Sequence, residues 1–260
     1  MLTYEQIKNY YQDGTDKKIS KALIVEYLQY ELLDSIFQQK SSRYLSFIGG
    51  TAIRIVYNSD RFSEDLDFDN FGLEFSVFKQ LIEAVTQDMG NKGFSVDFRL
   101  VEKNAFHCYI KFRDIIHNIN LSQTPAEKIL IRIDTQRKNK LFEPVLFTLN
   151  KFDVYRKILV NPIDIILAQK LIAILERKRE KGRDFYDVSY LLGLTSPDFE
   201  YIEKTLKISK KLFINKLLKR CESFNYTLLA KDVAPFVTDE KHLSRVESFW
   251  SYIQQVAKKW

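Results

Sequence analysis

The chain has 260 residues, of which 45% are apolar and 28% are charged, so it can bury a sizeable core in one large domain or two smaller ones. Its two cysteines, Cys108 and Cys221, form no Cys-x-x-Cys motif, so neither a disulfide framework nor a zinc site is indicated. No signal-peptide pattern occurs and no run reaches the roughly 18 apolar residues of a membrane span, which predicts a cytoplasmic protein without a membrane partner.

The net charge of +6 is unevenly distributed along the chain. Residues 1–150 contain 19 Lys and Arg against 20 Asp and Glu, whereas residues 151–260 contain 21 against 14. Because Lys and Arg bind nucleic-acid phosphates whatever the base sequence, the basic C-terminal part is consistent with an RNA partner. Solubility alone also accounts for a net charge of this size.

The N-terminal region predicts two helices, over residues 4–12 and 18–40, because apolar residues recur there at helical spacing. An apolar run at residues 43–48 predicts the first strand. It ends at Gly49-Gly50, and residues 51–57 predict a short helix after this glycine turn.

Carboxylates then alternate with apolar residues. In a strand, Asp65 and Asp67 lie on one face while Leu66 and Phe68 enter a core. Two like charges so placed repel each other, which favours a cation such as Mg²⁺ between them. The alternative is a solvated strand edge.

The glycine pair complements the carboxylates. A glycine turn that opens a helix lets backbone N–H groups approach a phosphate, although a Gly-Gly pair alone is more often an ordinary turn. Both elements within about 20 residues, in the order strand, glycine turn, helix and acidic strand, indicate a triphosphate–metal site.

These motifs resemble a known pattern, that of the polymerase-β-like nucleotidyltransferases and, in fuller form, the AbiEii/AbiGii toxin family, which includes the MenT toxins. The resemblance rests on Gly49-Gly50-Thr51-Ala52-Ile53-Arg54, Arg61-Phe62-Ser63-Glu64-Asp65-Leu66-Asp67-Phe68, Lys170-Leu171-Ile172-Ala173, Arg177 and Arg183-Asp184-Phe185-Tyr186-Asp187-Val188. It implies an α/β (α+β) core with a mixed sheet flanked by helices, an NTP substrate with Mg²⁺ or Mn²⁺, a tRNA 3′ end as acceptor, and a cognate antitoxin.

The middle of the chain predicts a helix and then several strands. The helix covers residues 74–90; the strand candidates are 94–101, 106–112, 129–133 and 145–149, which are rich in β-branched and aromatic residues. Polymerase-β-type sites use a third carboxylate from a neighbouring strand, and Asp134 is the candidate by position, although a turn residue at a strand end is an equal alternative. His107, His117 and His242 lack partners at metal-binding spacing and are interpreted as structural.

A second block begins after Asn161-Pro162 with a helix over residues 163–178. Lys170 and Arg177 fall on one face of it, which suits a triphosphate, although alone such a pair is more often a solvated basic stripe. Asp184 and Asp187 have an ordinary explanation as N-cap and N3 residues of a capping box. The family resemblance instead implies that they face the active site, with Lys170 and Asp187 as site residues and Asp184 as their neighbour.

Residues 198–260 predict helices only, so we expect a nucleotidyltransferase domain at 1–195 and a C-terminal helical domain, a bundle, at 196–260. Residues 204–220 form an amphipathic basic stretch whose apolar side is explained by packing, and residues 246–260 predict a final packed helix.

Together these patterns predict a nucleotidyltransferase that transfers an NMP to an acceptor hydroxyl, with Asp65 and Asp67 as the metal ligands. Asp134, Asp184 and Asp187 are the candidates for the third carboxylate. The predicted catalytic residues are Asp65, Asp67, Asp134, Lys170 and Asp187. The predicted nucleotide-binding residues are Gly49, Gly50, Thr51, Arg54, Ser63, Arg177 and Asp184. The alternatives are a nucleotide- or RNA-binding protein without catalysis, and transfer to a protein or a small molecule.

Overall fold

The computed structural model describes residues 1–11, 17–115 and 127–260, so His117 lies outside the described residues. Contacts divide the chain into two compact units. The sheet unit comprises Met1–Ala52, Phe62–Lys140 and Pro144–Val160, and the helical unit comprises Ile53–Arg61, Leu141–Glu143 and Asn161–Trp260. The sequence-based boundary between residues 195 and 196 does not coincide with the division into these two units. That it separates two independently folding domains stays a prediction.

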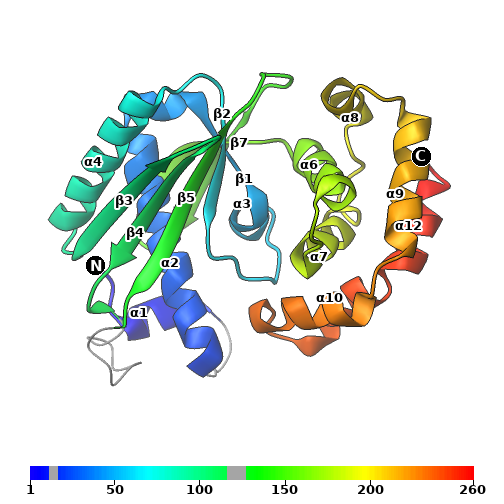
Figure 1. The fold of residues 1–260 in the computed structure, drawn as a ribbon. Coiled ribbons are helices and arrows are strands. Elements are labelled where there is room, and N and C mark those ends of the chain that lie inside the picture. Colours follow the sequence, from blue (N-terminus) through cyan, green and yellow to red (C-terminus); the bar gives the residue numbers. More distant parts are fainter. Residues whose placement is uncertain (12–16, 116–126) are drawn as a thin grey trace. The chain divides into compact units, whose positions relative to one another are not determined.

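The sheet unit contains a seven-stranded mixed sheet in the order β3-β4-β5-β2-β1-β7-β6 (Figure 1). Its strands are β1 (Leu45–Ile48), β2 (Leu66–Asn70), β3 (Val96–Glu102), β4 (Phe106–Phe112), β5 (Ile129–Arg137), β6 (Val145–Lys151) and β7 (Val154–Val160). The pairs β2–β5 and β1–β7 are parallel, and the other neighbours are antiparallel. A mixed sheet with flanking helices is therefore confirmed.

The sheet unit contains α1 (Tyr4–Lys8), α2 (Lys17–Gln38), the start of α3 (Gly49–Ile55) and α4 (Phe75–Asn91). Helices α2 and α4 pack on one face of this sheet. Phe68 of β2 meets Phe37 of α2 at a ring-centroid distance of 6.2 Å, and Phe106 of β4 meets Phe78 of α4 at 5.6 Å. Because strand residues alternate between faces, the neighbours of Phe68 in β2 point to the opposite face of the sheet.

Strand β7 is absent from the sequence-based prediction. A two-residue turn, Phe152 and Asp153, joins it to β6, and Phe152 has a positive φ of 57°. Hairpin turns with positive φ usually carry Gly, Asn or Asp at such positions, so this turn lacks the usual sequence signal. The structure also extends β5 to Arg137 and starts α3 at Gly49 itself.

The helical unit contains α6 (Ile163–Glu176), α7 (Gly182–Leu191), α8 (Phe199–Leu206), α9 (Lys210–Glu222), α10 (Tyr226–Val233), α11 (Ser244–Glu247) and α12 (Phe249–Ala257). Phe185 of α7 packs edge-on against Phe224, Tyr226 and Phe249 in its core. The basic stretch is not one helix, because Lys207 ends α8 in the left-handed conformation with φ of 55°. Within the described part of the chain, the helices are too short or too polar to span a membrane.

Candidate active site

Two aspartates and a histidine form a row across three adjacent strands of the sheet unit. Asp67 of β2 is the register partner of Asp134 in the parallel strand β5, and Asp134 is the register partner of His107 in β4. His107 Nδ1 lies 2.7 Å from Asp134 Oδ1. Since Phe68 faces α2, Asp67 and its register partners lie on the opposite face. The sheet thus brings together two of the predicted carboxylates.

Arg132 links this row to the third acidic residue. Its Nη2 lies 2.8 Å from Asp65 Oδ2, and its Nε lies 3.0 Å from Asp134 Oδ2. Partial burial lowers the pKa of Arg132, but the charges of Asp65, Asp134 and Asp67 outweigh this and raise it above its usual value. A single guanidinium therefore offsets part of the repulsion among three carboxylates.

The glycine turn lies directly against Asp67. Gly49 has a positive φ of 80°, and a Cβ added there would lie 2.5 Å from Asp67 Oδ2. Only glycine allows the backbone to approach the carboxylate this closely. Next to it, the buried Thr51 hydroxyl donates to the backbone carbonyl of Asp65 and so ties the start of α3 to the residue before β2.

The acidic residues fit a hard divalent cation in their chemistry, because Asp65, Asp67 and Asp134 supply only carboxylate oxygens, the ligands that Mg²⁺ prefers. The close approach of Gly49 to Asp67 also leaves no side chain on that side of the carboxylate. Across residues 1–11, 17–115 and 127–260, however, no three His, Cys, Asp or Glu side chains are grouped closely enough to hold a metal ion. Arg132 contacts Asp65 and Asp134, so a cation there would compete with its guanidinium.

A second cluster of charges lies in the helical unit. Lys170 Nζ lies 3.0 Å from Asp184 Oδ1 and 2.8 Å from Asp187 Oδ2. Asp187 also accepts a bidentate pair from Arg61, with Nε at 2.9 Å and Nη2 at 2.8 Å. Arg177 Nη1 lies 3.3 Å from Asp184 Oδ2. The cluster joins three cations to two buried carboxylates.

Burial and charge act in opposite directions in this cluster. Burial lowers the pKa of Lys170, but Asp187 and Asp184 raise it above its usual value. Burial likewise raises the pKa of Asp184, but Lys170 and Arg177 lower it below its usual value. The opposite charges therefore favour the ionised forms of Lys170 and Asp184.

The predicted capping box is wrong. Lys181 is the N-cap of α7 without a side-chain hydrogen bond, Asp184 lies inside its first turn, and Asp187 is fully buried. The helix starts at Gly182, which packs so closely against the Leu229 carbonyl that a Cβ would clash with it. Both carboxylates are consequently committed to side-chain cations.

We expect Asp184→Asn to lower stability at neutral pH and to make less difference in acid. The depressed pKa of the Asp184 carboxyl means that its contribution is fully present above about pH 4, the unfolded value, and is lost as pH falls through the folded value. Thermal unfolding midpoints of both proteins between pH 7 and 3 test this. A difference between the two unfolding midpoints that stays constant down to pH 3 would contradict this expectation.

Two other predicted nucleotide-binding residues make contacts within their own units. Arg54 Nη1 donates to the Ser59 carbonyl at 2.7 Å within the helical unit. The Ser63 carbonyl accepts from Gln29 Nε2 at 2.9 Å within the sheet unit. The first contact holds the Arg54 side chain and the second holds the Ser63 backbone, and neither tests whether the residue binds a nucleotide.

Sequence reasoning missed three residues of these clusters: Arg132, His107 and Arg61. Arg132 and Asp134 are two residues apart in one strand, so alternation could have placed them on one face. His107 and Arg61 carry no such local signal, because their partners lie 27 and 126 residues away.

Residues 31–248 match the family model of nucleotidyl transferase AbiEii toxins of type IV toxin–antitoxin systems. The chain belongs to the AbiEii family. It is accordingly a nucleotidyltransferase, and the resemblance seen in its motifs is confirmed. None of the curated proteins matches this AbiEii-family chain.

Solved structures show the same fold. JHP933 from Helicobacter pylori and a candidate nucleotidyltransferase from the same species each have a TM-score of 0.58 and 18% sequence identity. Each alignment covers 92% of this chain, and it covers 94% of the first structure and 97% of the second. The described AbiEii-family chain thus shares its architecture with these proteins over nearly its whole length.

Proposed function

We propose that this AbiEii-family toxin transfers an NMP from an NTP, with Mg²⁺, to the terminal hydroxyl of a tRNA 3′ end. The observation that carries the proposal is the pairing of Asp67 with Asp134 on neighbouring strands, beside Asp65 and the glycine turn. Such a group of oxygen ligands suits a nucleotide triphosphate that arrives with its cation.

In the proposed reaction, the acceptor oxygen forms a bond to the α-phosphorus of the NTP, and the bond from that phosphorus to the β-phosphate oxygen breaks. Pyrophosphate leaves, and the acceptor proton passes to a base, for which we assign Asp134. His107, 2.7 Å from the same carboxylate, holds it in place. A divalent cation bound by Asp65 and Asp67 would neutralise the phosphate charge and polarise the α-phosphoryl group.

The remaining predicted residues receive supporting roles in the proposal. Backbone N–H groups at Gly49 and Gly50 position phosphates, with Thr51 fixing the turn and Ser63 and Arg54 completing the nucleotide contacts. Lys170 and Arg177 offset the charge of the departing pyrophosphate. Asp187 and Asp184 act as positioning residues, because both contact the Lys170 ammonium.

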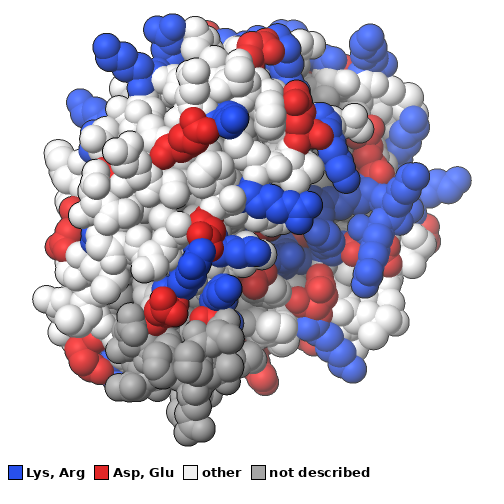
Figure 2. Space-filling view, turned by 60° about the vertical axis from the view of Figure 1, so that its left-hand side comes forward, with Lys and Arg blue, Asp and Glu red and all other residues white. Residues whose placement is uncertain are grey.

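The RNA acceptor is supported by charge. Residues 151–260 contain 21 Lys and Arg against 14 Asp and Glu. Figure 2 shows Lys and Arg side chains extending from the surface, with Asp and Glu between them. Extended basic side chains supply sequence-independent affinity for phosphates, which suits recognition of many tRNAs. A toxin of a type IV system further suggests a cognate antitoxin protein as a partner.

The proposal is tested by incubating the purified protein with total tRNA, Mg²⁺ and each of the four α-labelled NTPs. We expect label on tRNA from at least one NTP, and none with the Asp65→Ala/Asp67→Ala variant or after chelation of the metal. Label that appears only on protein in a cell lysate would favour the alternative acceptor. Nucleotide binding without transfer to any acceptor would leave a non-catalytic binding protein.

We expect Gly49→Ala to reduce transfer about 10- to 100-fold, because displacement of the nearby catalytic carboxylate by a fraction of an ångström misaligns the reacting groups. The left-handed backbone adds a stability cost of about 1–2 kcal/mol. The matched control is Gly90→Ala, since a Cβ at this helical glycine would meet no atom within 4 Å. Initial transfer rates and urea denaturation test both variants, and equal rates for the two would contradict the expectation.

A further inference from the structure

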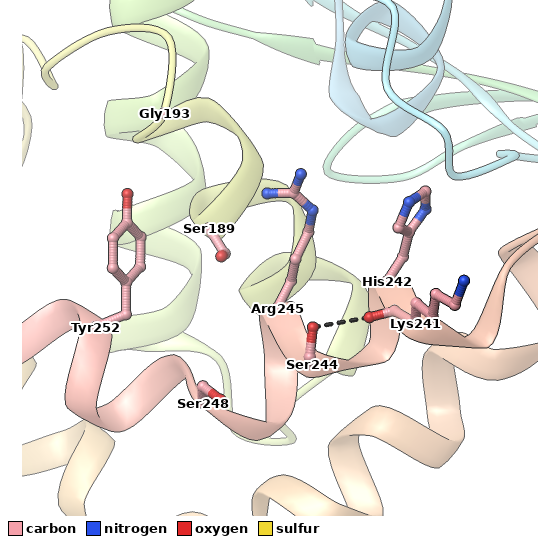
Figure 3. A pocket seen from close by; sticks show the side chains of 8 residues that line it. All are labelled: Ser189, Gly193, Lys241, His242, Ser244, Arg245, Ser248 and Tyr252. Carbon is pink, nitrogen blue, oxygen red and sulfur yellow. Dashed lines mark hydrogen bonds between the residues drawn. The ribbon is translucent and has the colours of Figure 1, made fainter.

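A pocket with no role in the proposed reaction lies within the helical unit, between α7 and the C-terminal segment (Figure 3). Its volume is about 490 Å³, within the range of roughly 300–1,000 Å³ that small organic ligands occupy. Ser189 and Gly193 line it from α7 and the residues after it. The other side is formed by η3 (Glu240–Leu243), α11, Ser248 and α12.

The lining is basic and rich in hydroxyl groups. Lys241 and Arg245 supply cations, His242 supplies an imidazole, and none of the eight lining residues is acidic. Outside the lining, Asp60 Oδ2 lies 3.6 Å from His242 Nδ1. Figure 3 shows the side chains of His242, Arg245 and Tyr252 projecting to the same side of the C-terminal segment.

The main cation of the pocket is held in place. The Arg245 guanidinium lies over the Tyr190 ring, 5.5 Å from its centroid. The Ser244 hydroxyl donates to the Lys241 carbonyl at 2.7 Å and so fixes the turn that carries both cations (Figure 3). The lining thus offers a guanidinium, an ammonium and hydroxyl groups, which are donors that bind phosphate oxygens.

A neighbouring pocket of about 270 Å³ shares Tyr252 as a wall and is also lined by Lys259 and Trp260. Aromatic faces next to cations are the features on which single-stranded nucleic acids stack their bases. Two adjoining pockets, one cationic and one aromatic, therefore match the alternation of phosphate and base along a strand.

We propose that this pair of pockets binds RNA, with phosphate contacts from Arg245 and Lys241 and a base against Tyr252 and Trp260. A free nucleotide offers the same phosphate chemistry and is the other source. This inference rests on the proposed function, in which RNA is the acceptor. The pockets would add affinity for that RNA and take no part in the transfer reaction itself.

The test is binding of a labelled single-stranded RNA oligonucleotide to the full-length protein in EDTA, without NTP. We expect Lys241→Gln/Arg245→Gln to weaken binding about tenfold and to reduce the salt slope of log K by about 1.4, since each contact to a single strand contributes about 0.7. The matched control is Lys211→Gln/Lys216→Gln, which removes the same charge from exposed positions of α9. We expect a much smaller change there.

Equal losses of RNA affinity in the two double variants would overturn the site, because the overall positive charge of the protein would then explain the binding. The exposed Lys241→Gln alone, with an expected loss of about threefold, decides the matter if the double variant fails to fold. Binding of labelled ATP is measured in the same buffer. If Lys241→Gln/Arg245→Gln weakens ATP binding but not RNA binding, the pocket binds a free nucleotide and the RNA assignment is overturned. Since no NTP is present in the RNA assay, its outcome is independent of whether transfer occurs.

Discussion

Replacing Asp67 with Asn is expected to lower the rate of NMP transfer at least about 10²- to 10³-fold while the protein stays folded. Asn keeps the shape of the side chain but removes the negative charge at the residue that lies between Gly49 and Asp134. The thermal midpoint should change little, because the substitution also relieves repulsion between neighbouring carboxylates. The rate is measured with α-labelled NTP and tRNA.

The matched control is Asp97→Asn in β3, which makes the same chemical change on the same sheet. Asp97 pairs with Arg113 at an exposed position, so transfer should stay within about twofold of the unsubstituted protein. In cells that express the toxin, growth arrest should be lost with Asp67→Asn and kept with Asp97→Asn. Full transfer by the Asp67→Asn protein would refute the assignment of β2 and β5 as the catalytic strands.

Replacing Arg61 with Met is expected to destabilise the helical unit by about 3–5 kcal/mol, because it leaves the Asp187 carboxylate buried without its bidentate partner. Both side chains are almost wholly buried, with 2% and 0% of their surface exposed. Lys170, 2.8 Å from Asp187, offsets only part of that charge. The measurement is the free energy of unfolding from urea denaturation, followed by circular dichroism.

A double variant separates the pair's interaction from simple loss of volume. Arg61→Met/Asp187→Leu removes both charges, and its stability should recover part of the loss, because the two apolar side chains need no charged partner while Lys170 keeps its contact with Asp184. Arg113→Met, which breaks the exposed pair with Asp97, serves as the control and should leave the unfolding midpoint nearly unchanged. A double variant as unstable as Arg61→Met alone would contradict the expectation that the unpaired Asp187 carboxylate causes the loss of stability.

Local patterns in the sequence determined the first half of the candidate site. The alternation around Asp65 and Asp67 predicts which side chains share a face, and Phe68 does pack against a helix on the other side. The glycine pair after an apolar strand predicts the turn at Gly49. These features depend on residues within about 20 positions of each other, where backbone geometry alone relates sequence to space.

Only the tertiary structure decided the partners of these residues. Asp134 lies beside Asp67 because β2 and β5 pair in parallel, and nothing local specifies that pairing or its register. Asp187 pairs with Arg61 across 126 residues of sequence, so the local capping box was the simpler but wrong interpretation. In a folded chain, burial makes an unpaired carboxylate far more costly than an uncapped helix end, and distant cations therefore determined the positions of Asp184 and Asp187.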